Sequence, residues 1–178
     1  MNALNPRFPR PAILVVLKVL IVMGELLCLL GQWFVFVIST EIVSEIPETT
    51  PGLWPYRIAG ALGIACLEVA FAAVWPLLTL AGRQDVFSGK AIHWVNLTIG
   101  SAIAEGILVL AVLVFSNLSL PYVKPNGQVV QAALGAPMLE LMLVVALLLI
   151  AAFVLLMWVM RSLLMQAIGQ RRELEGVI

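Results

Sequence analysis

Four long apolar stretches, separated by shorter polar segments, dominate the pattern of hydrophobic and polar positions along the chain. About 18 to 20 apolar residues are enough for a helix to cross a membrane, and each of these stretches is longer. Short connections between consecutive spans favour an up-down bundle of four helices. The pattern therefore predicts an all-α integral membrane protein that forms a single membrane domain over residues 1–178. The predicted spans cover about residues 13–39, 56–80, 91–115 and 137–160.

The first two stretches carry features that indicate contact between helices. The polar residues of the first stretch recur at every seventh position: Lys18, Glu25, Gln32 and Ser39. This spacing places them on one narrow face of a helix. Because lipid cannot solvate such a face, we expect it to turn toward other helices or toward a water-filled cavity. The second stretch is rich in glycine and alanine, which permits close approach of a neighbouring helix.

Prolines and polar residues define the connections and the tail. Residues 40–55 read as a loop or a short interfacial helix, followed by Tyr56 at the level of the lipid headgroups. Residues 81–90 form a short polar turn, and residues 116–136 form a second long loop with turn-forming residues at its centre. The tail, residues 161–178, favours a helix that either extends the fourth span or docks beneath the bundle.

The basic residues predict the orientation. One side of the membrane receives seven of them and the other side receives two, a bias that places the richer side in the cytoplasm. Both termini and the turn at 81–90 should then be cytoplasmic. The seven are Arg7, Arg10, Arg83, Lys90, Arg161, Arg171 and Arg172, and the two are Arg57 and Lys124.

Composition narrows the class of protein further. Hydrophobic residues make up 62% of the chain and charged residues only 11%, with no net charge. Soluble domains are about half apolar and about a quarter charged, so this class is excluded. The scattered basic residues give no footprint for direct binding of nucleic acid. The lipid bilayer is therefore the first partner of this protein.

Each span contains one glutamate, and three of these lie deep in their spans. Glu25, Glu68 and Glu105 sit roughly 10 to 14 residues from the outer end, near the middle of the bilayer. Glu140 lies only about one turn below the outer interface. Oxygen or amide groups that could support a site with them are Gln32, Thr98 and Ser101.

These carboxyl groups admit two interpretations. The first is a site for a proton, a metal cation or a cationic small molecule, since ionisable residues inside a membrane usually serve a function. An all-oxygen site would suit a hard metal cation, although the sequence names neither a metal nor a cofactor. The second interpretation is structural: protonated carboxyls donate hydrogen bonds between helices, each contributing roughly 0.6 kcal/mol.

The sequence gives no support for an enzyme. The glutamates lack the Glu-x-x-His pairing of di-iron bundles, and no nucleophile–base pair or phosphate-binding loop is present. The single histidine, His93, is expected to be an interfacial polar anchor. Cys28 and Cys66 both lie in apolar stretches, where cysteine behaves as a small hydrophobic residue.

Two segments resemble a known family. GRQDVFSGKAIHWVN in the turn and LLMQAIGQRRELEGVI at the end are similar to the corresponding parts of small bacterial four-span proteins, catalogued as domain of unknown function twenty-nine seventy-five. The resemblance is most specific at Asp85, Phe87 and Ser88 and at the ending 173–178. Residues 89–91 depart from it, because the usual polar residue after the Phe-Ser step is replaced. The resemblance implies a bacterial inner-membrane protein with a helix-turn-helix regulator as a genetic or physical partner, and it supplies no catalytic residues.

Two functions therefore compete. The first is binding or conduction of a cation, a proton or a cationic small molecule by the intramembrane glutamates, with a homo-oligomer expected if the activity is transport. The alternative is a non-transporting accessory or signalling protein that acts through its cytoplasmic loop and tail. The residues expected to contact a cytoplasmic partner are Asp85, Phe87, Ser88, Arg171, Arg172 and Glu173.

Overall fold

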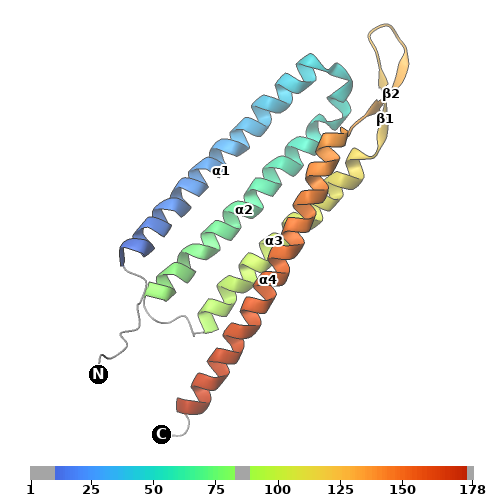
Figure 1. Cartoon of the computed structure of the whole chain (residues 1–178). Helices are drawn as coiled ribbons and strands as arrows, with labels where there is room; N and C mark the ends of the chain where they lie inside the picture. The colour runs from blue at the N-terminus through green and yellow to red at the C-terminus, as the bar shows by residue number, and fades with distance from the viewer. Residues whose placement is uncertain (1–10, 83–88, 176–178) are drawn as a thin grey trace.

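Four long helices of alternating direction make up most of the molecule (Figure 1). The computed structural model describes residues 11–82 and 89–175. Within these ranges all four helices are long and apolar enough to cross a membrane. The protein is thus a four-helix, multi-pass membrane protein, as the apolar pattern predicts. The helices are α1 (Pro11–Glu45), α2 (Leu53–Gly82), α3 (Gly89–Ser116) and α4 (Pro137–Glu175).

The helices pack in the order in which they follow along the chain. α1 lies against α2, α2 against α3, and α3 against α4. Over the described residues, α1 and α4 share no substantial contact, so both helices leave most of their surface to the lipid. This packing makes α2 and α3 the inner helices. Every substantial interface between the long helices in the described residues therefore involves α2 or α3.

The polar face of α1 turns toward α2, as its seven-residue spacing predicts. The Lys18 ammonium lies 5.2 Å from the centre of the Trp75 ring, which permits a cation–π contact. Two turns further on, Glu25 comes close to Glu68. Gln32 and Ser39 also bond to side chains of α2. The α1–α2 interface is therefore lined with polar contacts along its whole length.

The connection between α1 and α2 is more helical than the sequence indicates. α1 continues past the expected end of its span to Glu45, and a 3-10 helix (η1, Pro47–Gly52) leads directly into α2. Of the two arrangements expected for residues 40–55, a loop or a short interfacial helix, the structure has the helical one over most of the segment. Thr40 and Ser44 donate hydrogen bonds to carbonyls of the preceding turn, which satisfies their hydroxyls within the helix.

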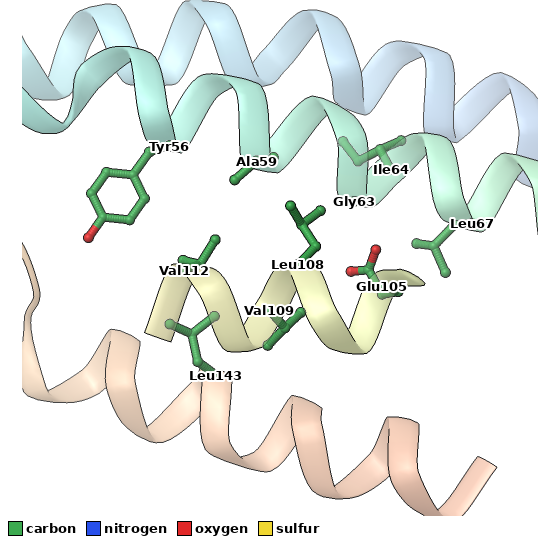
Figure 2. A pocket seen from close by; sticks show the side chains of 11 residues that line it. Tyr56, Ala59, Gly63, Ile64, Leu67, Glu105, Leu108, Val109, Val112 and Leu143 are labelled. Carbon is green, nitrogen blue, oxygen red and sulfur yellow. The ribbon is translucent and has the colours of Figure 1, made fainter. Parts of the chain in front are cut away.

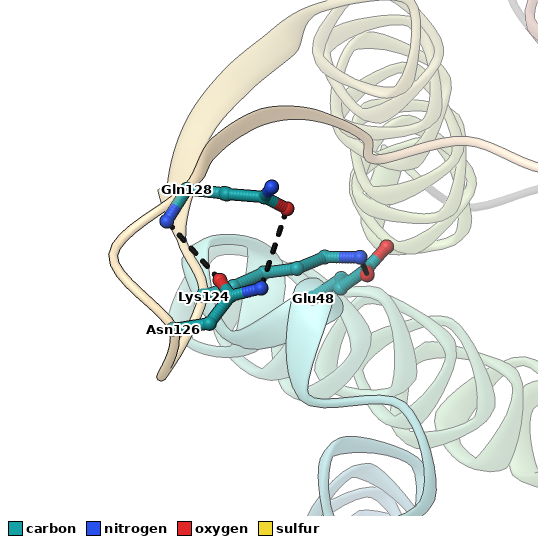
Figure 3. A network of polar contacts seen from close by, with 4 residues as sticks. All are labelled: Glu48, Lys124, Asn126 and Gln128. Atoms are coloured by element: carbon teal, nitrogen blue, oxygen red, sulfur yellow. Dashed lines mark hydrogen bonds and ion pairs between the residues drawn. The ribbon is translucent and has the colours of Figure 1, made fainter.

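The second long connection differs from the prediction of a loop. It contains an antiparallel hairpin of β1 (Ser119–Val123) and β2 (Val129–Ala133), paired from Ser119 opposite Ala133 to Val123 opposite Val129. The expected turn residues lie at its tip, where Gly127 adopts a φ of 82°. Lys124 in this turn forms a 2.8 Å ion pair with Glu48 of η1, which joins the two connections (Figure 3).

α4 continues well beyond the length that a membrane requires. Its 39 residues span about 58 Å at 1.5 Å per residue, against a hydrocarbon core of about 30 Å. Residues 161–175 of the tail therefore extend the fourth span as a helix, one of the two arrangements expected. We call this segment the helical extension of α4.

Candidate cation site between the helices

A cavity of about 290 Å³ lies between α2, α3 and α4, and its walls are almost entirely apolar. Glu105 of α3 supplies the only ionisable acid among the lining residues, and Tyr56 lines the end nearest the hairpin (Figure 2). Glu105 Oε2 is buried without a hydrogen-bond partner among the described residues. The site thus combines a hydrophobic wall with one carboxyl group that has a buried oxygen without a partner in the described chain.

Glu105 fits into this position because its neighbour on α2 is a glycine. A Cβ atom built on Gly63 would lie 3.2 Å from Glu105 Oε1 and 3.4 Å from Oε2. The carboxyl group therefore lies directly against the backbone of α2, and Figure 2 shows it pointing from α3 toward Gly63. The Cys66 side chain, one turn along α2, also lies close to Glu105. A thiol is a weak donor and cannot neutralise a carboxylate.

A second carboxyl cluster lies between α1 and α2. Gln32 Nε2 donates a 3.2 Å hydrogen bond to Glu68 Oε2, while Glu68 Oε1 is buried with no partner in the described part of the chain. Glu25 lies near enough to Glu68 for their charges to interact. Cys28 lies near both acids. We call Glu25, Gln32 and Glu68 the α1–α2 cluster.

The structure therefore divides the deep glutamates between two interfaces. Glu25 and Glu68 meet at the α1–α2 interface, whereas Glu105 belongs to the cavity between α2, α3 and α4. In residues 11–82 and 89–175, no group of three or more His, Cys, Asp and Glu side chains is arranged to hold a metal ion.

The other expected site residues have local roles. Thr98 and Ser101 are buried on α3, but their hydroxyls donate to carbonyls of their own helix, at 3.1 Å to Trp94 and 2.9 Å to Thr98. Glu140 lies at the hairpin end of the molecule, where its carboxyl packs beside Gly135. None of these three residues lines the cavity that contains Glu105.

The expected partner-contact residues can be placed only in part. Asp85, Phe87 and Ser88 lie outside the described residues. Arg171, Arg172 and Glu173 belong to the helical extension of α4, and their side chains lie outside the described part. The structure therefore assigns these last three residues to a helix and leaves their contacts as predictions.

Gly63 and Tyr56 are functional candidates that sequence reasoning did not single out. The run of small residues in α2 signals close packing, but it does not say which partner approaches or at which glycine. Tyr56 reads as a headgroup-level aromatic. In the structure its ring meets Phe115 edge-on at 5.7 Å, and its hydroxyl donates a 2.8 Å hydrogen bond to the Leu134 carbonyl. Its ring thereby closes one end of the cavity.

Four apolar helices with carboxyl groups held between them define a multi-pass membrane protein with polar sites inside its helical layer. The family model described as "Protein of unknown function (DUF2975)" matches residues 37–178, most of the chain. The protein belongs to this family, which is the one that the turn and the tail resemble. The comparisons with curated proteins and with solved structures found no match.

Proposed function

We propose that this protein binds a small hydrophobic organic cation in the cavity between α2, α3 and α4, with Glu105 as the counter-charge. The observation that carries the proposal is the Glu105 carboxyl, which has a buried oxygen without a hydrogen-bond partner in the described chain and lies in an apolar cavity. A cation bound there would neutralise the carboxylate, and a cation with an N–H group would also donate a hydrogen bond to this oxygen. Ionisable side chains inside a membrane are costly unless they are paired, which favours an occupant with positive charge.

The shape and chemistry of the cavity favour an organic cation over a hydrated inorganic ion. Its volume of about 290 Å³ lies near the lower limit for small-molecule sites, and its lining is predominantly aliphatic. An aliphatic wall cannot replace the water around an inorganic ion, whereas it stabilises the apolar part of an amine or a quaternary ammonium group. Tyr56 adds an aromatic ring, a common partner for such cations.

The α1–α2 cluster supports a linked role for protons. Glu25 and Glu68 lie close enough for their charges to interact, so a proton or a small cation bound between them would relieve the repulsion of two carboxylates. α2 contributes to both the cluster and the cavity, and Gly60, which lines the cavity, also lies against Val35 of α1. A change of charge in the cluster could therefore be felt at the cavity through the packing of a single helix.

The family resemblance and the distribution of basic residues favour a particular membrane and orientation. We place the protein in the bacterial inner membrane, with both termini on the cytoplasmic side, because most basic residues lie on the side of the termini. The hairpin and η1 would then face outward. In this orientation the aromatic end of the cavity is nearer the outer surface.

A thermal-shift experiment tests the proposal. The probe is benzyltrimethylammonium, and neopentylbenzene is its uncharged isostere. We expect the cation to raise the unfolding midpoint of the wild type and of Glu25→Gln, because a ligand stabilises the state that it binds. It should fail to do so for Glu105→Gln. A shift that persists in Glu105→Gln but disappears in Glu25→Gln would refute the cavity and indicate the α1–α2 cluster as the site.

The helical extension of α4 favours a second candidate function. It continues the helix through Leu163 and Met165, which are about half exposed, and into the tail that the family model covers. An accessory or signalling protein could present this helix to a cytoplasmic regulator. Deleting residues 171–178 should then abolish capture of that regulator while leaving the unfolding midpoint unchanged, whereas unchanged capture would contradict this function.

A further inference from the structure

A second cavity lies at the hairpin end of the molecule and shares Tyr56 with the cavity that contains Glu105. Its volume is about 380 Å³, and it is enclosed by the end of α1, by η1, by the start of α2 and by the residues that lead into α4. The lining is mostly aliphatic: Ile42, Val43, Ile46, Leu53, Leu134 and Leu139. Ser39 and Thr49 are among its few polar members. The cavity therefore offers an apolar chamber at the depth where lipid tails meet their headgroups.

Arg57 holds a positive charge beside this chamber. Its Nε donates a 2.6 Å hydrogen bond to Ser39 Oγ, and Ser39 lines the cavity. Its Nη2 donates to the Phe36 carbonyl at 3.2 Å and to Thr40 Oγ1 at 2.5 Å. These bonds fix the guanidinium plane. Over the described residues Nη1 makes no hydrogen bond, and no carboxylate forms an ion pair with Arg57.

Two aromatic rings next to Arg57 indicate the depth of its guanidinium group in the membrane. The guanidinium carbon lies 5.5 Å from the centre of the Trp54 ring and 5.7 Å from that of Phe36. Trp54 is 63% exposed at the start of α2, a position typical of tryptophans at the membrane–water interface. The free donors of Arg57 therefore lie at headgroup level, next to an apolar chamber that opens at the same depth.

The geometry points to a binding site for an anionic phospholipid at the hairpin end, with its phosphate on Arg57 Nη1 and one acyl chain in the adjacent cavity. A guanidinium with two free donors matches the oxygens of a phosphate, and its charge favours an anionic lipid over a zwitterionic one. The apolar chamber can hold an acyl chain, which a phospholipid has and free phosphate lacks. The site therefore favours a phospholipid over free phosphate. This inference does not depend on the proposed cation site.

Glu48 and Glu41, two of the acidic residues at the same end, leave the Arg57 side of the chamber accessible. Glu48 is neutralised by its 2.8 Å ion pair with Lys124. Glu41 lies two residues from both Ser39 and Val43, so it points roughly 200° around α1 from these cavity-lining positions. Glu140 at the start of α4 packs beside Gly135, which lines the chamber, while Arg57 lies on the α1–α2 side next to Ser39. The lipid phosphate is therefore placed on the α1–α2 side.

The test measures lipid retention by native mass spectrometry of the full-length protein, released from detergent with phosphatidylglycerol or phosphatidylcholine of identical acyl chains. The wild type should retain phosphatidylglycerol about tenfold better than phosphatidylcholine, because both lipids offer the same phosphate but phosphatidylcholine adds a choline cation that Arg57 repels. Arg57→Gln should abolish this preference. The control Lys124→Gln, which removes a positive charge from the same end, should keep it.

Two further variants cover the case in which Arg57→Gln fails to fold. Arg57→Lys retains the charge and should keep part of the preference. Ala136→Phe fills the chamber and leaves Arg57 intact, so it should lower retention of both lipids. Equal preference in the wild type and Arg57→Gln would overturn the inference. Displacement of bound phosphatidylglycerol by millimolar inorganic phosphate would also overturn it, because it would show that the acyl chain contributes nothing.

Discussion

Replacing Gly63 by valine tests how tightly the Glu105 carboxyl is held against α2. The new Cβ would lie 3.2 Å and 3.4 Å from the two carboxyl oxygens, closer than an ordinary van der Waals contact, and two methyl groups would follow it. Gly100→Val is the matched control, because a Cβ there would meet no atom of the described residues within 4 Å. Both substitutions change the helix propensity equally, so their difference reports the packing around Glu105.

The expected difference follows from the cost of overpacking. Adding methyl groups to a filled interface costs typically about 1–3 kcal/mol, so Gly63→Val should be less stable than Gly100→Val by about that amount. Reversible unfolding in mixed micelles measures both free energies of unfolding. Displacing the carboxyl should also weaken binding of benzyltrimethylammonium, by roughly tenfold for every 1.4 kcal/mol of binding free energy that is lost. Equal stability and equal binding in the two variants would refute the contact between Gly63 and Glu105.

Three other contacts make separate predictions. Tyr56→Phe removes the hydrogen bond to the Leu134 carbonyl and should lower the free energy of unfolding by about 0.5–1.5 kcal/mol; no loss would mean that this bond does not form in the membrane. Gln32→Leu removes the bond to Glu68 and should cost about 0.6 kcal/mol, measured in the same unfolding assay; a stability gain would indicate that the pair is strained. Gly127→Ala forces a side chain into the left-handed region at a cost of about 1–2 kcal/mol, which hydrogen exchange should detect as faster exchange in the hairpin alone, and unchanged exchange would contradict the turn.

The spans could be predicted from the sequence because their signal is local. An apolar stretch long enough to cross a membrane leaves few alternatives to a helix, since every backbone group must be bonded within the segment. The seven-residue spacing of polar residues in α1 predicts that this face turns toward other helices. The contacts of Gln32 and Ser39 with α2 confirm this prediction.

The arrangement between helices could not be read in the same way. The depth of a residue in the membrane follows from counting residues along its span. This count places Glu25, Glu68 and Glu105 at a similar depth. The direction in which each carboxyl points depends on how the helices rotate against one another, and this separates Glu105 from the other two. The hairpin was missed because its strands are short and β1 contains Pro121, so turn-forming residues dominated the local pattern.

The affinity ratio between a cation and its uncharged isostere tests the central proposal most directly. Equilibrium dialysis of the protein in lipid nanodiscs would give dissociation constants for benzyltrimethylammonium and neopentylbenzene, in the wild type and in Glu105→Gln. The proposal predicts that the wild type prefers the cation by about tenfold or more, about 1.4 kcal/mol, and that Glu105→Gln loses this preference. An identical preference in both proteins would show that the carboxyl of Glu105 is not the counter-charge.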